Sequence, residues 1–535
     1  MTALIIISAI LIGVFIHDRF IQDKHIILTK YPVIGHIRYL FEAIGPEMRQ
    51  YFVAGNREER PFNRIQRSYI YASSKKQNNM QGFGSDADFV KTGHFFIEQS
   101  NFPYRVGENH INHEQKDFLP SAKIIGEYHK RLKPFHPKSV INISAMSYGA
   151  LGSGATESNN RGAGMANAYH NTGEGGFSPY HNTGADVVFQ IGTAYYGCRD
   201  DKGKFSMDEL VKLTAENPTI KMIEVKLSQG AKPGKGGILP AEKVTKEIAA
   251  IRKIKAGEAS ISPGFHTAFS DTKSLVLFIE EIARRTGLPV GIKSAVGQDK
   301  FWVDLAFYMK EYNIGPDFIT IDGGEGGTGA APAAFADHVS LPFDVAFSNV
   351  YKLFQRCGLE NRITFIASGK LGLPAESIKA FALGADMINM AREALLSQGC
   401  IQAQKCHTGT CPTLIATNKH QGMYNIPYKS ERVANYIKTL RKDILEITHA
   451  CGYEHPCQIK TEDIQINVVA TNVPVKLNEL YGYNKTTVSF AGMDYLTEEN
   501  IKRNLGKIQI EKIAEEHKEN FNKNSLLNKY KKQNF

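Results

Sequence analysis

Residues 289–322 read PVGIKSAVGQDKFWVDLAFYMKEYNIGPDFITID, and this stretch contains the repeating unit of the predicted fold. It starts with a short apolar and β-branched run, PVGIKSAV, continues through a longer helical pattern and ends in a second run, DFITID. A strand, a helix and a second strand in this order are typical of a parallel β-α-β unit. The fold class therefore depends on how often this unit recurs.

Eight runs of this kind recur from residue 139 onward, separated by glycine-rich turns and helical patterns. Several are apolar at both odd and even positions, as strands buried on both faces should be. Eight units that close on themselves predict an α/β protein with a (β/α)8 TIM barrel. A doubly wound sheet would show the same alternation, so the strand count favours the barrel. The predicted strands are SVINISAM (139–146), DVVFQI (186–191), KMIEVKL (221–227), ASISP (259–263), PVGIKSAV (289–296), DFITID (317–322), ITFIAS (363–368) and DMINMA (386–391).

Polar residues follow the predicted strands, at the end of a barrel where the β-α loops form active sites. They are Ser147, Tyr148, Gln190, Gln229, Lys232, Lys293, the loop DGGEGGTGAAP after residue 321, Ser368 to Lys370, and Arg392. Glycines crowd at the same rim. This combination matches the usual phosphate site of such barrels, and flavin mononucleotide (FMN) fits it.

Two of the glycine-rich segments resemble nucleotide motifs, and neither satisfies its motif. GEGGTG at 324–329 has the G-x-G-x-x-G spacing, but Pro332 follows where a dinucleotide fingerprint should open a helix directly. In GAKPGKGG at 230–237, Lys235 is followed by glycine instead of the Ser or Thr of a P-loop. The sequence therefore does not indicate a nicotinamide dinucleotide or ATP.

Three of the seven cysteines lie within twelve residues, in GCIQAQKCHTGTCP. Cys400, Cys406 and Cys411 are followed at once by Pro412. Three thiolates near one another with a trailing proline favour an iron-sulfur cluster that lacks one iron corner. Zinc with His407 as the fourth ligand, and thiols without a ligand, are the alternatives. The odd number of cysteines does not indicate the disulfide framework of a small secreted domain.

The N-terminus carries an uncharged apolar run, ALIIISAILIGVFI, at residues 3–16. With its neighbours it is long enough for one membrane anchor, while a buried N-terminal helix is the alternative. A cleaved signal peptide would need a basic n-region and a small-x-small cleavage site, and we find neither in this segment. The basic residues follow the apolar run, so the positive-inside rule predicts a single-pass protein of the cell membrane with its catalytic domain in the cytoplasm.

The net charge of +10 is uneven along the chain. From Ile501 onward there are nine Lys or Arg and four Glu, so this tail is predicted to be either a surface arm for anionic lipid or an acidic partner, or a solvated helix. We expect no nucleic-acid binding, because no stretch interleaves Arg with aromatic residues. The predicted regions are an N-terminal transmembrane anchor (1–22), an N-terminal extension (23–137), the barrel with its cysteine loop (138–455) and a basic helical C-terminal tail (456–535).

Several of these motifs together resemble the FMN-binding synthase domain of the glutamate synthase large subunit, from about residue 138 to 425. They are ISAMSYGALGSGATESNNRGA, HNTGEGGFSPYH, QIGTAYYGCRD, IEVKLSQGAKPGKGGILPAEKV, ISPGFHTAFSD, IDGGEGGTGAAP and GCIQAQKCHTGTCPTLIAT. The resemblance implies a β/α barrel with FMN and a 3Fe-4S cluster. It also implies reduction of 2-iminoglutarate, formed from 2-oxoglutarate and ammonia, to L-glutamate.

The resemblance also implies roles for individual residues. Cys400, Cys406 and Cys411 are the implied cluster ligands. Lys293 and Gln190 are similar to residues that contact the flavin ring. Residues implied to line the flavin or hold its phosphate are Ala145, Met146, Ser147, Gly324, Gly369 and Arg392. Residues implied to surround 2-oxoglutarate are Gln229, Lys232, Arg252 and Glu174. A dicarboxylate needs cations of this kind, and Lys293 would stabilise an anionic reduced flavin.

The sequence departs from the full-length family pattern in ways that change the expected partners. It lacks the N-terminal cysteine of a glutaminase domain, because no cysteine precedes Cys198, and we expect no long C-terminal β-helical domain. We therefore expect free ammonia or an amine-supplying partner, and an electron-donor protein such as a ferredoxin or a reductase subunit. Two alternatives remain: an enzyme acting on an N-alkylated glutamate, similar to N-methylglutamate synthase, and a non-catalytic electron-transfer subunit at the membrane.

Overall fold

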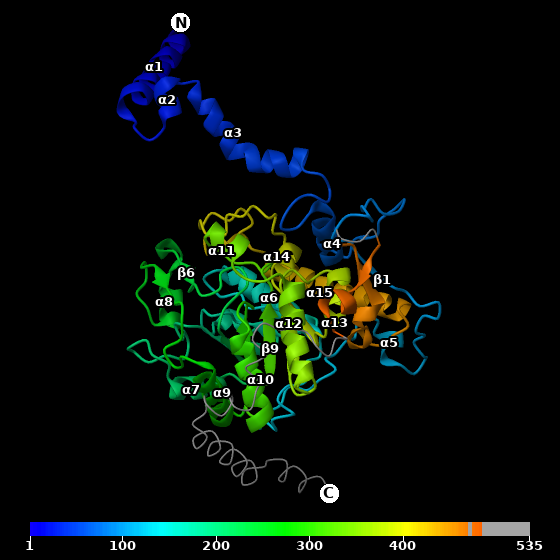
Figure 1. Ribbon diagram of the computed structural model, residues 1–535. Coiled ribbons are helices and arrows are strands. Elements are labelled where there is room, and N and C mark those ends of the chain that lie inside the picture. Colours follow the sequence, from blue (N-terminus) through cyan, green and yellow to red (C-terminus); the bar gives the residue numbers. More distant parts are fainter. Residues whose placement is uncertain (469–472, 484–535) are drawn as a thin grey trace. The chain divides into compact units, whose positions relative to one another are not determined.

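The computed structural model describes residues 1–468 and 473–483 (Figure 1). The chain divides into two compact units, residues 1–68 and residues 69–535, and each is described by itself. The predicted basic tail from residue 501 onward lies outside the described residues. The predicted region boundaries at residues 22, 137 and 455 stay predictions.

The second unit contains a closed barrel of eight parallel strands, which confirms the predicted (β/α)8 TIM barrel. Every residue of most of its strands is buried, for example Thr364–Ser368 and Phe318–Asp322, which pair in register from end to end. Burial on both faces explains why these runs are apolar at both parities. Around the barrel the order is β10 (Thr364–Ser368), β11 (Met387–Met390), β2 (Ile141–Ile143), β3 (His170–Asn171), β4 (Val187–Ile191), β5 (Ile220–Lys226), β8 (Val290–Ser294) and β9 (Phe318–Asp322).

Seven of the eight predicted strands are barrel strands, and the prediction for 259–263 is wrong. In that segment β7 (Ser260–Ile261) pairs antiparallel with β6 (Ile238–Leu239), in a two-stranded sheet outside the barrel. The missing barrel strand is β3, which has only two residues, His170 and Asn171. The two residues are polar and glycines follow them, so the sequence shows no strand pattern here. The strand is defined by its pairing with β2 and β4.

Helices surround the barrel (Figure 1). Helix α9 begins and ends as its sequence dictates, since Asp271 caps the N-terminus together with Ser274 and Gly287 adopts the left-handed conformation at the C-cap. The 25-residue helix α15 packs along α6. The larger helices of this layer are α6 (Ser153–Met165), α7 (Met207–Glu216), α9 (Thr272–Thr286), α10 (Lys300–Tyr312), α12 (Phe343–Arg356), α13 (Pro374–Ala382) and α15 (Ile426–Ala450).

A buried ion network closes the amino-terminal end of the barrel strands. Arg131 donates to both carboxylate oxygens of Glu280 at 2.7 and 2.9 Å, and its Nε lies 3.0 Å from both oxygens of Asp317. Asp317 also accepts the backbone N–H of Val290 and lies 2.8 Å from Nδ1 of His129. Every one of these charges has a partner of opposite sign or a hydrogen bond, which is the condition for burying it.

Chain segments from both ends of the second unit meet in a small sheet. Strand β12 (Ile464–Ile466) pairs antiparallel with β1 (Phe95–Ile97) and with β13 (Val475–Lys476). The described part of the predicted C-terminal region therefore contains strands as well as helices. Its remaining elements include α16 (Leu477–Tyr481).

The first unit starts with α1 (Thr2–Ile16) and the π-helical turn η1 (His17–Ile21), which together are long and apolar enough to cross a membrane. No residue of α1 is buried within the first unit, and the predicted anchor and its alternative, a buried N-terminal helix, both stay predictions. Short α2 (Ile26–Lys30) follows, then α3 (Gly35–Met48) and a second π-helical turn, η2 (Arg49–Val53). The helix α4 (Arg64–Ser74) contains the division between the units.

Candidate active site

The candidate site lies at the carboxyl end of the barrel strands, around a small, partly open hollow. Side chains that follow different strands line it, including Glu174 after β3, Lys226 at the end of β5 and Gln229 just beyond it. Two residues implied for substrate binding, Glu174 and Gln229, are thus brought together. Lys226 was not predicted and lies between them.

Lys226 connects the two predicted residues through its ammonium group. Its Nζ lies 2.7 Å from Glu174 Oε1 and donates to Gln229 Oε1 at 2.7 Å. Burial raises the pKa of Glu174, but the charge and hydrogen bond of Lys226, with the charges of Lys232 and Arg252, hold this pKa below its ordinary value. Glu174 is therefore an ionised carboxylate at neutral pH, surrounded by three cations.

The cations outnumber the carboxylate at this hollow. The positive charges of three residues act on the carboxylate of Glu174: Lys226, Lys232 and Arg252. Three cations against one anion leave a surplus of two positive charges. Lys235 also lines the hollow, but its side chain is exposed and its charge is screened by water. A dianionic ligand would neutralise the surplus, and a dicarboxylate has the required charge.

Lys232 and Arg252 are both buried, so their charges are poorly solvated. Burial and the charge of Lys226 lower the pKa of Lys232, while Glu174 raises it, and the net direction is downward. Lys232 Nζ donates to the backbone carbonyl of Ala330 at 2.9 Å. The positive surplus is therefore complete only below the lowered pKa of Lys232.

Arg252 ends α8 (Lys246–Arg252) and reaches the barrel mouth. It donates to the carbonyl of Tyr148 at 3.1 Å and to Ser260 Oγ at 3.3 Å, and its guanidinium lies 5.0 Å from the ring centroid of Tyr196. Its buried Nε has no hydrogen-bond partner among the residues that the structure describes. The guanidinium thus retains a donor that the protein itself does not use.

Lys293 is buried at the end of β8, next to the hollow. Its Nζ lies 3.7 Å from Asp322 Oδ2 and 3.4 Å from Ser144 Oγ, and Asp322 also accepts the backbone N–H of Gly230 at 2.8 Å. This pair is electrically balanced, in contrast to the hollow. It holds a cation at the barrel mouth, where the sequence predicts the flavin ring.

The barrel interior below the mouth contains a polar cluster around Glu224, which sequence reasoning missed. Glu224 accepts hydrogen bonds from Asn171 Nδ2 at 2.8 Å, Gln190 Nε2 at 2.6 Å and Thr320 Oγ1 at 2.7 Å. The amide of Gln190 is therefore held by Glu224. Glu224 and Lys226 are two residues apart in β5, so they share a face of the strand, and this spacing was the available signal.

The loops predicted to hold the flavin converge at the same end. After β2, residues 145–147 are partly exposed, and a Cβ on Gly173 would lie 2.6 Å from the backbone nitrogen of Ser147. Gly369 has φ +131°, and a Cβ there would lie 3.2 Å from the nitrogen of Gly323. Gly173 is required because the neighbouring loop passes too close for a side chain, whereas at Gly369 the positive φ favours glycine.

The loops after β9, β10 and β11 also meet, which the predicted phosphate site requires. The N–H of Gly323 donates to Ser368 O at 2.9 Å, and Arg392 donates to the carbonyl of Glu325. The N–H of Gly324 donates to Leu341 O, so this predicted residue offers no N–H to a phosphate. A glycine-bounded cradle with Arg392 beside it and Lys293 near the ring position fits a bound FMN.

The cysteine loop lies against the same end of the barrel. Cys400 and Cys411 both pack on one apolar cluster, and so does Met146 of the predicted flavin loop. Cys406 is close enough to Cys411 for each charge to influence the other, and Lys243 donates to the carbonyl of Cys406 at 3.4 Å. The predicted flavin loop and the predicted cluster ligands are therefore neighbours. The apolar cluster consists of Leu151, Ala155, Ile415 and Tyr424.

The thiol of Cys411 is in a setting that favours thiolate. Burial raises its pKa, but the Thr413 hydroxyl and the backbone N–H groups of Ala416, Thr413 and Ile415 outweigh burial, and the pKa is lowered. A ligand thiolate needs such donors. Within the described residues no three His, Cys, Asp or Glu side chains are placed to hold a metal ion, so the iron-sulfur cluster and the zinc alternative both stay predictions.

Comparison with known proteins identifies the family. The model of the family described as "Conserved region in glutamate synthase" matches residues 98–454. The "Glutamate synthase large subunit-like protein YerD" of Bacillus subtilis is 38% identical over 476 residues, which cover 83% of this chain and 90% of that protein.

Two further relatives are longer than the matched region. An archaeal glutamate synthase (NADPH) of Methanocaldococcus jannaschii is 36% identical, over 58% of this chain and 59% of its own length. A ferredoxin-dependent glutamate synthase of Cyanidium caldarium is 33% identical, over 45% of this chain and 15% of its own length. The family match covers most of the barrel and the hollow at its mouth. The chain belongs to the glutamate synthase family and is an oxidoreductase that acts on CH–NH2 donors.

Proposed function

We propose that this chain reduces 2-iminoglutarate, formed from 2-oxoglutarate and ammonia, to L-glutamate. The observation that carries the proposal is the surplus of two positive charges around Glu174, which lines the hollow, provided by Lys226, Lys232 and Arg252. A dicarboxylate matches this surplus in charge. A monocarboxylate would leave one buried cation uncompensated, which is costly in free energy.

The cationic residues would bind the two carboxylates of the substrate. Arg252 has an unused Nε donor, and a guanidinium can grip a carboxylate through two parallel hydrogen bonds. The ammonium group of Lys232 would bind a carboxylate of the substrate in place of its present hydrogen bond to the Ala330 carbonyl. The amide of Gln229 is held through its oxygen by Lys226, and its NH2 group donates one hydrogen to Thr328 Oγ1 at 3.2 Å, which leaves the second N–H for the substrate.

FMN is the cofactor that the family and the barrel mouth support. Gly369 and Arg392 would hold its phosphate, residues 145–147 would line its ring, and Lys293 would place a positive charge next to the ring. When bound, FMN would supply a hydride to the imine carbon. The protein must supply the proton for the imine nitrogen, and Lys226 is a buried ammonium group that lines the hollow. A proton from solvent would then restore the ammonium of Lys226, which the carboxylate of Glu174 stabilises by its charge.

Electrons would enter through a 3Fe-4S cluster on Cys400, Cys406 and Cys411. Met146 and two of these cysteines contact one apolar cluster, so the route to the flavin loop is short. The donor would be another protein, a ferredoxin or a reductase subunit. The names of two relatives mention ferredoxin and NADPH, and for this chain both stay open to test.

The cellular location that we propose is the cell membrane. Residues 2–21 would span it once, and their exposed apolar surface supports this because water solvates it poorly. Basic residues follow the span, so the catalytic unit would face the cytoplasm.

The test uses the purified full-length chain and its visible spectrum. The oxidised protein should show flavin and cluster bands that dithionite bleaches. Adding 2-oxoglutarate with ammonium to the reduced protein should restore the flavin band and form L-glutamate. A colourless protein, or a reduced flavin that stays reduced, would contradict the proposal. If turnover is faster with methylamine than with ammonium, the chain is instead an enzyme that forms an N-alkylated glutamate.

A pair of cysteine variants tests the cluster separately. Cys411→Ser should lose the cluster band and keep the flavin band, because it removes one proposed ligand. Cys357→Ser removes a partly buried thiol outside the cysteine loop and should keep both bands. If the two variants have equal spectra, the proposal that Cys411 is a ligand of an iron-sulfur cluster is contradicted.

A further inference from the structure

Helix α3 exposes a continuous apolar stripe to solvent. Ile37, Leu40, Phe41, Ile44 and Met48 have exposed fractions of 53, 57, 63, 40 and 47%. Their spacing places them on one face of the helix. The stripe continues into η2 through residues 51–53, where Phe52 is 78% exposed. A stripe of this length is unfavourable in water, so it is a surface for a further contact.

The opposite side of α3 is charged, which distinguishes it from α1. Arg38 and Glu42 form an ion pair at 2.8 Å on that side. Residues 17–68 contain nine Lys or Arg and six Asp or Glu, a net charge of +3. An amphipathic helix in a basic segment is typical of the surface of an anionic membrane, and α1 by contrast is apolar on all sides.

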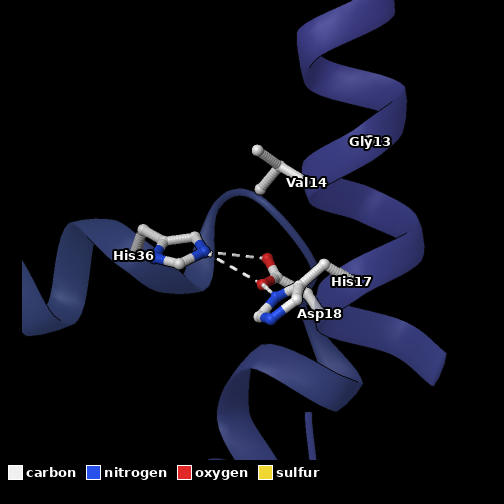
Figure 2. Close-up of a pocket in the computed structure, with 5 residues that line it drawn as sticks. All are labelled: Gly13, Val14, His17, Asp18 and His36. Carbon is white, nitrogen blue, oxygen red and sulfur yellow. Dashed lines mark hydrogen bonds and ion pairs between the residues drawn. The ribbon is translucent and has the colours of Figure 1, made fainter. Parts of the chain in front are cut away.

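The start of α3 is tied to the end of the apolar N-terminal segment. Asp18, which is fully buried, accepts the backbone N–H of Val33 at 2.9 Å and lies 2.9 Å from Nε2 of His36. Figure 2 shows the contact between Asp18 and His36, with the helix that carries His36 running across the direction of α1. If α1 crosses a bilayer, then α3 starts near the end of that span. Because α3 runs across the direction of α1, it lies along the bilayer surface.

We propose that residues 34–53 form an interfacial helix that lies in the headgroup region of an anionic leaflet, with the apolar stripe toward the acyl chains. The inference rests on the proposed membrane anchor, because that anchor sets the depth of Asp18 and of the start of α3. The charged side, which carries Arg38, Glu42 and Arg49, faces the headgroups, and most of the net positive charge comes from the rest of residues 17–68. The stripe thereby gives the chain a second membrane contact, parallel to the surface.

The experiment places a tryptophan on each side of α3 in the full-length chain. The variants are Phe41→Trp in the stripe, Glu42→Trp on the charged side and Ile10→Trp within α1. Each is reconstituted in vesicles of phosphatidylcholine and phosphatidylglycerol that carry brominated lipids, which quench nearby tryptophan. The single native tryptophan, Trp302, is buried in the barrel unit and gives the same background in all three.

The depth of the bromine decides the outcome. Phe41→Trp should be quenched at least about twofold more than Glu42→Trp, and most by bromine near the top of the acyl chain, because interfacial helices bury their apolar face by roughly 5–10 Å. Ile10→Trp should be quenched most by bromine deep in the chain. Quenching of Ile10→Trp without quenching of Phe41→Trp would overturn the interfacial helix and leave the anchor intact.

The remaining outcomes are also distinguishable. Emission from Phe41→Trp that is shifted to the blue but not quenched would mean that protein covers the stripe, such as a second copy of the chain, and would overturn the proposal. Quenching of Phe41→Trp alone, at shallow depth, would support the interfacial helix and contradict the anchor. Quenching at neither position would overturn both.

Discussion

The two ends of the barrel both hold buried charges, and they differ in how completely those charges are neutralised. At the amino-terminal end Arg131 is enclosed by Glu280 and Asp317, with His129 beside them. At the carboxyl end Glu174 faces three cations, and Arg252 keeps an unused donor. A complete network needs nothing more from outside, whereas an incomplete one is stabilised by a ligand. The difference separates a structural network from a binding site.

Removing the central cation of the complete network should have the largest effect. Arg131→Met leaves the carboxylates of Glu280 and Asp317 buried without their main partner, so the free energy of unfolding should fall by about 3–5 kcal/mol. Chemical denaturation of the purified protein measures this. The control is Arg161→Met, which breaks an exposed pair with Glu157 and should cost about 0.3–0.5 kcal/mol. A cost for Arg131→Met no larger than that of the control would show that the network does not stabilise the fold.

The matching change at the other end should affect binding more than stability. Arg252→Met removes one cation from a site with a positive surplus, so the free energy of unfolding should change little. The KM for 2-oxoglutarate should rise by about 10- to 150-fold, from the loss of about 1.5–3 kcal/mol for hydrogen bonds to a charged group. Steady-state kinetics measures it, with Arg252→Lys as the variant that keeps the charge. If Arg252→Met lowers the free energy of unfolding as much as Arg131→Met does, the proposed difference between the two ends of the barrel is contradicted.

The pH dependence of the incomplete site should be the smallest effect and the most specific. The pKa of Lys232 is lowered below its ordinary 10.5, chiefly by burial. As pH rises through that lowered pKa, Lys232 loses its proton and affinity for a dicarboxylate should fall by up to about tenfold per pH unit. The stability of the ligand-free protein should rise over the same window, because the unfolded chain binds more protons than the folded one.

Calorimetric binding and thermal unfolding over this pH range test the two opposite trends. Lys232→Arg, which stays protonated, should remove both. Trends that run in the same direction in the unsubstituted chain, or that persist in Lys232→Arg, would contradict the assignment.

Strand positions could be read from the sequence where burial alone shapes a strand. Runs such as 317–322 and 363–368 became β9 and β10 because both faces of these strands are buried. The two-residue strand β3 could not be predicted, since His170 and Asn171 are polar and closure of the barrel specifies their pairing. The run at 259–263 has strand-like residues, but its partner is the distant β6 outside the barrel.

The site was partly predictable for a similar reason. Gln229 follows a strand and was found because parallel strands end at one rim, whereas Lys293 lies within β8 and has its predicted flavin contact from the family resemblance. Lys226 and Glu224 lie within β5 and were missed, since the inward face of a strand is known only once the barrel closes. The network of Arg131 joins residues 149 and 186 positions apart, a pairing that local patterns do not encode.

The most direct test of the account measures the charge that the barrel mouth accepts. Isothermal titration calorimetry of the purified, cofactor-loaded chain would compare 2-oxoglutarate with 2-oxobutyrate, which lacks the second carboxylate. The account predicts that 2-oxoglutarate binds at least about tenfold more tightly, a difference of about 1.4 kcal/mol or more, and that added salt narrows the gap. Equal affinity for the two acids would contradict a site built around two surplus positive charges.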